Sequence, residues 1–90
     1  MTTGSVAQRI ESALSAALQP SSLRVQDDSA QHVGHAGARE GGHFTVRVVS
    51  ARFAGLPRVA RHRLVYDALA PLMREGIHAL AIEAHTPEEQ

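Results

Sequence analysis

The sequence predicts an α+β domain in which helices pack on a three-stranded mixed sheet. Two observations carry this prediction. Apolar residues recur at helical spacing in two stretches, and three other stretches are either continuously apolar or alternate between apolar and polar residues. With 90 residues, the chain has room for one modest hydrophobic core. We therefore expect a single domain over residues 1–90, with its core in about residues 5–87.

The first element is predicted to be an amphipathic helix that begins after Ser5 and ends before Pro20. Serine is a favoured N-cap, and proline stops a helix. The apolar stripe consists of Val6, Ile10, Ala13, Leu14, Ala17 and Leu18. Because Arg9 and Glu11 interrupt this apolar segment, we expect neither a signal peptide nor a membrane span.

Two strands are predicted next, at residues 23–27 and 43–50, because apolar and polar residues alternate in both stretches. Phe44, Val46 and Val48 then share one face of the second strand. The segment between the strands, residues 29–42, contains four glycines and almost no large apolar side chain. It is interpreted as the long loop of a hairpin, and loops of this length are usually functional or mobile.

A second helix is predicted to begin at Pro57, which suits the first helical position. Its apolar side consists of Leu64, Val65, Ala68, Leu69, Leu72 and Met73. Pro71 removes one backbone hydrogen bond, so the last turn should kink or begin to end there, before Gly76 closes the helix. Residues 77–84 are nearly all apolar and predict a third strand. A helical start at residues 86–88 follows.

This order of elements determines the expected topology. The hairpin makes the first two strands antiparallel, and a right-handed crossover through the second helix makes the second and third strands parallel. The chain therefore reads helix, strand, strand, helix, strand and helical stub.

Charge argues against a dedicated nucleic-acid binder. Nine arginines balance nine acidic residues, there is no lysine, and the formal net charge is zero. The one basic cluster consists of Arg52, Arg58, Arg61 and Arg63, near the start of the second helix. It could bind phosphates beside the helix N-terminus, or it could be a solvated face on which Arg63 pairs with Asp67. No nucleophile elbow, carboxylate pair or phosphate loop is present, so an enzyme is not expected.

The chain has six histidines and no cysteine. A metal bound by these imidazoles must therefore take any thiolate ligand from another molecule. His62 falls on the apolar side of the second helix, so we expect one of its ring nitrogens to bond to nearby backbone. His43 is expected to orient the second strand or the loop, or to contact a metal-ligating side chain without binding the metal itself. His85 is expected to be exposed and without a role.

Four motifs together resemble the BolA family over about residues 5–87. They are His43-Phe44-Thr45-Val46-Arg47-Val48-Val49-Ser50, Phe53-x-Gly55, Arg61-His62-Arg63-x-Val65-Tyr66 and Ile77-His78-Ala79-Leu80-Ala81-Ile82. The resemblance implies an αββαβ(α) fold similar to class II KH domains, in agreement with the order of elements above. It also implies a function, because BolA proteins act with monothiol glutaredoxins on [2Fe–2S] clusters. In bacteria they are also described as transcriptional regulators of stress response and cell shape.

The resemblance further implies two metal ligands. His78 matches the family's histidine near the start of the last strand. His35 matches the histidine or cysteine of the hairpin loop, with His32 as the less favoured alternative. A glutaredoxin cysteine and a glutathione thiolate would complete the cluster, as imidazole replaces thiolate on one iron of Rieske centres. Because imidazole can be protonated, cluster binding should depend on pH.

Other readings remain open beside the shared cluster. In one alternative the chain alone binds no metal, and in another His32, His35 and His78 bind zinc together with Asp27 or Asp28. A DNA-binding regulator that uses the arginine cluster is the main alternative. The Gly34-His35-Ala36-Gly37 segment does not support it, since KH domains place their G-x-x-G between two helices. We expect a cytoplasmic protein that is monomeric when alone and does not contact membranes, and its missing cysteines fit a reducing compartment.

Overall fold

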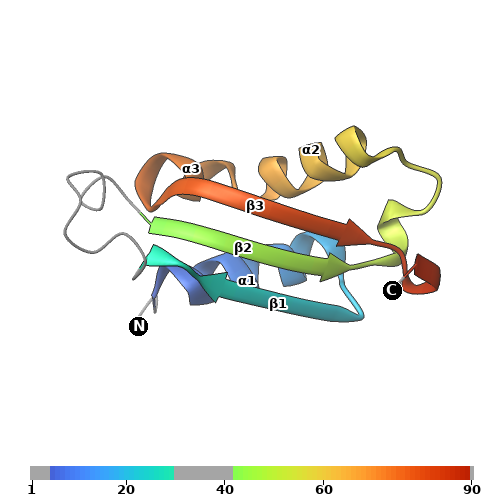
Figure 1. Cartoon of the computed structure of the whole chain (residues 1–90), viewed down its shortest axis with the longest axis horizontal. Helices are drawn as coiled ribbons and strands as arrows, with labels where there is room; N and C mark the ends of the chain where they lie inside the picture. The colour runs from blue at the N-terminus through green and yellow to red at the C-terminus, as the bar shows by residue number, and fades with distance from the viewer. Residues whose placement is uncertain (1–4, 30–41, 90) are drawn as a thin grey trace.

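The computed structural model describes residues 5–29 and 42–89 of the chain. Its elements are α1 (Val6–Leu18), β1 (Ser22–Asp27), β2 (Gly42–Val49), a 3-10 turn η3 (Ala51–Phe53), α2 (Arg58–Ala68), α3 (Ala70–Glu75), β3 (Ile77–His85) and a second 3-10 turn η4 (Pro87–Glu89) (Figure 1). The three strands form one sheet in the order β1-β2-β3. β1 pairs antiparallel with β2, and β2 pairs parallel with β3. The predicted α+β class, strand order and strand directions are confirmed.

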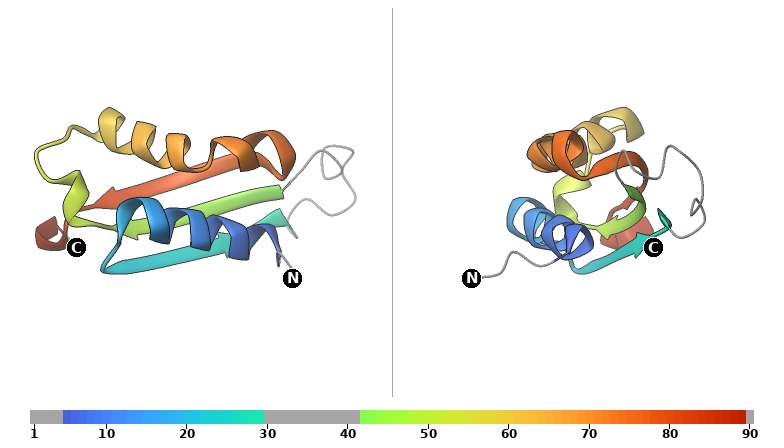
Figure 2. Two further views of the ribbon diagram at one scale, coloured as in Figure 1. Left: turned by 180° about the vertical axis from the view of Figure 1, so that it is seen from behind. Right: turned by 90° about the vertical axis from the view of Figure 1, so that its left-hand side faces the viewer.

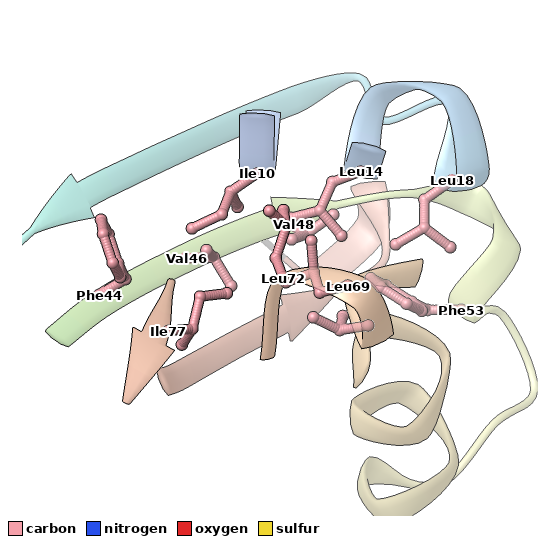
Figure 3. Packing of buried hydrophobic residues seen from close by; sticks show 11 residues of the cluster. Ile10, Leu14, Leu18, Phe44, Val46, Val48, Phe53, Leu69, Leu72 and Ile77 are labelled. Atoms are coloured by element: carbon pink, nitrogen blue, oxygen red, sulfur yellow. The ribbon is translucent and has the colours of Figure 1, made fainter. Parts of the chain in front are cut away.

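The three α-helices of the described residues lie on one face of the sheet, and none of them covers the other face, which is called the uncovered face below (Figure 2). The core fills the space between the sheet and the helices (Figure 3). Its buried members are Ile10, Leu14, Leu18, Phe44, Val46, Val48, Phe53, Val65, Leu69, Leu72 and Ile77. Since alternate residues of a strand point to opposite faces, the residues of β2 between these core positions belong to the uncovered face. They include His43.

The start of α1 agrees with the predicted cap. The Ser5 hydroxyl accepts a hydrogen bond from the Gln8 N–H at 3.2 Å, and the Ser5 N–H donates to the Gln8 side chain at 2.9 Å. This reciprocal capping box satisfies two backbone groups that a helix N-terminus otherwise leaves free. At the other end, Gln19 adopts a left-handed conformation with φ 45°, and Pro20 follows it. α1 therefore ends where the sequence predicts.

The predicted second helix is broken into two. α2 ends at Ala68, Leu69 has φ −103° and ψ 8°, and α3 begins at Ala70 with Pro71 in its first turn. The physical reason is the missing N–H of Pro71, which is tolerated in the first turn of a helix but not inside one. Pro57 is also one position off, because it occupies the N-cap of α2 rather than the first helical residue.

A hydrogen bond that the sequence did not predict joins α1 to the end of β2. The buried Ser50 hydroxyl donates to the Leu18 carbonyl at 2.6 Å and accepts from the Arg52 N–H at 3.1 Å. The Leu18 carbonyl belongs to the last turn of α1, where no helical partner remains. Ser50 thus satisfies the end of one helix and the start of the η3 turn with one side chain.

Candidate functional site

His78 is exposed at the start of β3, and the strand bulges at this residue. Gly42 pairs with Ile77, but the next residue of β2, His43, pairs with Ala79. His78 is therefore the extra residue and has no partner across the ladder. Bulges of this kind break the strict alternation of side chains and redirect one of them. Here the bulge puts an imidazole at the edge of the sheet while the neighbouring Ile77 stays in the core.

A glycine immediately before β3 lets α1 pack against this end of the sheet. A Cβ atom on Gly76 would lie 2.9 Å from a Val6 methyl carbon, closer than ordinary contacts allow. The Gly76 carbonyl also accepts a hydrogen bond from the Gly42 N–H at 2.9 Å. The backbone on which His78 sits is thus in contact with both α1 and the start of β2.

A second imidazole lies beside His78. The ring centroids of His43 and His78 are 5.2 Å apart, with the ring planes tilted by 50°. His43 is half-buried on the uncovered face of the sheet. The two histidines therefore form one local group at the start of β3.

Both described ends of the loop that carries His32 and His35 meet at the same end of the sheet. The Ser29 hydroxyl accepts a hydrogen bond from the His43 N–H at 3.0 Å, and the Asp28 N–H donates to the His43 carbonyl at 2.7 Å. The loop therefore leaves and re-enters the fold beside His78. His32, His35 and the glycines at 34 and 37 lie outside the described residues.

A shallow cavity of about 290 Å³ adjoins His43 on the uncovered face. Its polar wall includes the Asp28 carboxylate, which accepts hydrogen bonds from the Thr45 hydroxyl and the Gln26 amide, both at 2.6 Å. Within residues 5–29 and 42–89, no three His, Cys, Asp or Glu side chains gather closely enough to bind a metal ion. The zinc alternative depends on His32 and His35 and so lies outside the described residues.

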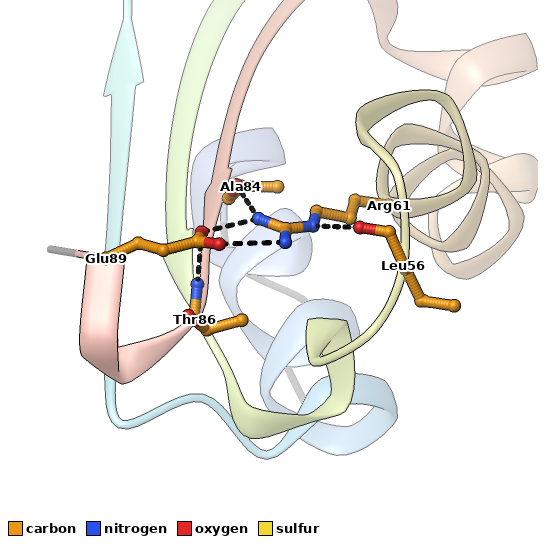
Figure 4. A network of polar contacts seen from close by, with 5 residues as sticks. All are labelled: Leu56, Arg61, Ala84, Thr86 and Glu89. Carbon is orange, nitrogen blue, oxygen red and sulfur yellow. Dashed lines mark hydrogen bonds and ion pairs between the residues drawn. The ribbon is translucent and has the colours of Figure 1, made fainter.

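The four arginines of the predicted basic cluster differ in how far other residues of the fold engage their side chains. Arg61 is engaged in a polar network (Figure 4): its Nε donates to the Leu56 carbonyl at 2.8 Å, and its Nη1 donates to the Ala84 carbonyl at 3.2 Å. Both Nη atoms also donate to the Glu89 carboxylate, at 2.6 and 3.0 Å. Of the five N–H donors that a guanidinium has, these contacts use four. Of the predicted cluster, Arg61 is thus occupied by contacts within the fold.

The same network changes the acidity of Glu89. The hydrogen bonds from Arg61, assisted by the Thr86 N–H at 3.0 Å, lower the pKa of Glu89 to about 2. Glu89 in turn raises the pKa of Arg61. The charged pair holds α2, the end of β3 and the η4 turn together.

The remaining arginines are exposed. Arg52 donates to the Gln19 side-chain oxygen at 3.1 Å. Arg58 and Arg63 make no hydrogen bond or ion pair with the part of the chain that the structure describes. The expected pair between Arg63 and Asp67 is accordingly not formed.

The other two histidines share a cavity at the far end of β3. This cavity, of about 660 Å³, lies between the first turns of α2 and residues 82–85 of β3. His62 lines it and forms no hydrogen bond with any described residue, so the expected bond to nearby backbone is absent. His85 was expected to be exposed and without a role, but it is half-buried and lines the same cavity. Only the pairing of strand and helix brings these two side chains together, and no local pattern indicates it.

A family model of the BolA-like proteins matches residues 14–89. The chain belongs to the BolA-like protein family. The resemblance in the four motifs is thereby confirmed.

Two relatives and one solved structure illustrate the range of the BolA-like family. The chain is 45% identical over 92 residues to SufE-like protein 1 of Arabidopsis thaliana. This match covers 96% of this chain but only 25% of that protein. It is 49% identical over 80 residues to the DNA-binding transcriptional regulator BolA of Vibrio cholerae, covering 89% of this chain and 74% of the relative. The solved BolA domain of SufE1 from Arabidopsis superimposes with a TM-score of 0.85 at 46% identity, covering 99% of this chain and 100% of that domain.

The chain thus spans about a quarter of the Arabidopsis SufE-like protein and about three quarters of the Vibrio regulator. None of the described helices is long and apolar enough to cross a membrane.

Proposed function

We propose that this BolA-like chain is a non-enzymatic cytoplasmic protein that shares a [2Fe–2S] cluster with a monothiol glutaredoxin. His78 is the ligand on the sheet, and His35 is the ligand on the hairpin loop, with His32 as its alternative. The observation that supports this proposal best is the position of His78. It is an exposed imidazole on a strand bulge, beside both described ends of the loop that carries the other two histidines.

The donor set fits a shared cluster better than a site within one chain. The chain has no cysteine, so every sulfur ligand must come from the glutaredoxin and from glutathione. An exposed imidazole at the edge of a sheet can be reached by a second protein without opening the core. The cluster itself supplies electron storage, and here it is cargo passed between proteins.

This chain's residues have distinct tasks in the proposal. His78 and the loop histidine each offer a neutral ring nitrogen, so protonation at low pH should weaken binding. His43, with its ring centroid 5.2 Å from that of His78, limits the directions in which the His78 ring can turn. The hydrogen bonds of Ser29 and Gly42 hold the loop ends against this group.

The test is co-expression with a monothiol glutaredoxin, followed by anaerobic absorption and circular dichroism spectroscopy of the purified complex. His78→Ala should abolish the visible spectrum of the mixed complex, and His35→Ala should do the same or shift it. His32→Ala in parallel separates the two loop candidates. Glu11→Ala, an exposed change on α1 at a residue that is not a proposed ligand, is the control that should keep the spectrum. An unchanged spectrum in His78→Ala would refute the proposal.

A second candidate function is direct DNA binding, favoured by the name of the Vibrio relative, which is 49% identical to this chain. Arg58 and Arg63 are the exposed cations that could contact phosphates. This candidate predicts that affinity for a promoter fragment falls steeply with salt. It also predicts that the double charge reversal Arg58→Glu, Arg63→Glu removes binding. Equal affinity for promoter and random DNA at moderate salt would exclude a sequence-specific regulator.

A further inference from the structure

The cavity at the far end of β3 opens on the outer edge of that strand. Ile82 and Ala84 belong to the face covered by the helices, whereas Glu83 and His85 belong to the uncovered face, yet all four line this cavity. A cavity can touch both faces of a strand only along its free edge. The opposite wall is the start of α2, with Pro57, Arg58 and His62. The result is a groove of about 660 Å³ between a strand edge and a helix.

The strand edge in this groove has main-chain groups available for pairing. The His85 carbonyl accepts from the Ser50 N–H at 2.9 Å, so the groups of His85 point toward β2. The alternate set, on Leu80, Ile82 and Ala84, points outward, because β3 is an edge strand with β2 as its neighbour in the described sheet. The Ala84 carbonyl accepts a hydrogen bond from Arg61. The outward groups of Leu80 and Ile82 have no hydrogen-bond partner among the described residues.

Two arginines and two carboxylates line the groove, and Arg58 is the one of these four groups that has no ion-pair partner among the described residues. Its two carboxylates are each matched by an arginine: Glu89 by Arg61 at 2.6 Å, and Glu83 by Arg47 of β2 at 3.7 Å. Arg58 makes no ion pair with a described residue, and the imidazoles of His62 and His85 add two further ring N–H donors. The groove therefore presents positive charge and hydrogen-bond donors, which suit an acidic ligand.

We propose that the groove between α2 and β3 binds an extended acidic segment of a partner protein, which adds as a strand to the free edge of β3. Strand addition derives its affinity from main-chain hydrogen bonds, and the side chains lining the groove select the sequence. Here Arg58 selects for acidic residues. A second copy of this chain is a poorer occupant, because it would bring another uncompensated Arg58 to the same interface. This binding site is separate from the His78 end of the sheet and does not depend on the shared-cluster function.

The probe for this groove is a short synthetic peptide in which glutamate and valine alternate, labelled with fluorescein and followed by fluorescence anisotropy. A matched peptide with lysine in place of glutamate is the ligand control. The acidic peptide should bind and the basic one should not. Arg58→Glu should weaken binding about tenfold or more, as expected for reversing a charge at an interface. Arg74→Glu, an exposed reversal of equal charge on α3 outside the groove, should leave binding unchanged.

The strand-addition geometry has its own readout in amide hydrogen exchange. Saturating acidic peptide should slow exchange of the Leu80 and Ile82 amides by about tenfold or more, because these N–H groups gain a partner. Three results would overturn the proposal: no binding of the acidic peptide, an equal loss of binding in Arg58→Glu and Arg74→Glu, or binding without protection of these two amides. Dimerisation in the absence of peptide that Arg58→Glu abolishes would assign the edge to a second copy and also overturn it.

Discussion

The two ends of β3 hold their polar side chains in opposite ways. At its C-terminal end, Arg61 and Glu89 form a network that engages α2, β3 and the η4 turn. At its N-terminal end, His78 is exposed on a bulge, and its one described ring contact is with His43. We call the C-terminal end of β3, where Arg61 and Glu89 pair, the closed end. The N-terminal end, where His78 is exposed, is called the open end. Charge and polarity therefore do not by themselves mark a functional side chain, since Arg61 supports the fold while His78 is exposed.

The largest expected effect contrasts two adjacent residues at the open end. Ile77 is 4% exposed and packs in the core, whereas His78 beside it is exposed. Ile77→Ala should lower the free energy of unfolding by about 2–5 kcal/mol, because it removes buried methyl groups and leaves a cavity. His78→Ala in the free chain should change it by about 0.5 kcal/mol or less, as for other surface substitutions. Urea unfolding followed by circular dichroism measures both, and a large loss in His78→Ala would mean that this end is not open.

A smaller effect is expected at the closed end. Arg61→Ala should lower the midpoint of thermal unfolding less than Ile77→Ala does, but more than Arg58→Ala, whose side chain has no described partner. Arg61→Lys should restore only part of the loss, because an ammonium group keeps the charge but cannot donate in the fork geometry of guanidinium. Differential scanning calorimetry gives the three midpoints. Equal midpoints for Arg61→Ala and Arg58→Ala would show that the network does not support the fold.

The smallest effect is a pH dependence that only the closed end should have. The network lowers the pKa of Glu89 from an ordinary value of 4.5 to about 2. A lowered pKa in the folded state means that the stabilisation is fully present above 4.5 and is lost as the pH falls toward 2. The stability difference between the wild type and Glu89→Gln should therefore be constant near neutral pH and shrink across this window. Urea unfolding at a series of pH values measures it, and a difference that stays constant down to pH 2 would contradict the pKa shift.

Local sequence signals predicted most of the fold. The Ser5 cap, the alternation in β1 and β2, and the apolar run of β3 each depend on residues a few positions apart, whereas the reciprocal bond from Gln8 was seen only in the structure. The rules for hairpins and crossovers then fixed the strand directions. Pro71 signalled a disturbance in the helix, but its own position did not show that the helix would end at Ala68 and begin again. Leu69, between the two helices, has φ −103° and ψ 8°, which the sequence pattern did not indicate.

The candidate sites were less accessible to sequence reasoning, because their partners are distant along the chain. Arg58 and Arg61 look equivalent in the sequence, and what separates them is Glu89, which is 28 residues beyond Arg61. His85 acquires its position in the groove only when β3 packs beside α2. The ligand assignment of His78 came from the family resemblance, while the bulge that exposes it depends on the register between two strands. The register of a parallel pair has no local signature.

The absent side chain of Gly76 has a consequence for how the open end meets a partner. Because Val6 occupies the space where a Cβ would lie, the first turn of α1 acts as a stop against the backbone that precedes His78. The backbone before His78 therefore has no space to move toward α1, and in the proposed function an incoming molecule would meet a strand that is already in place. The imidazole ring of His78 can still rotate to meet a ligand. Fixing one ring in place costs less conformational entropy than ordering a strand. Because Gly76 allows this close contact with Val6, the entropy lost on binding at this end comes mainly from the His78 side chain.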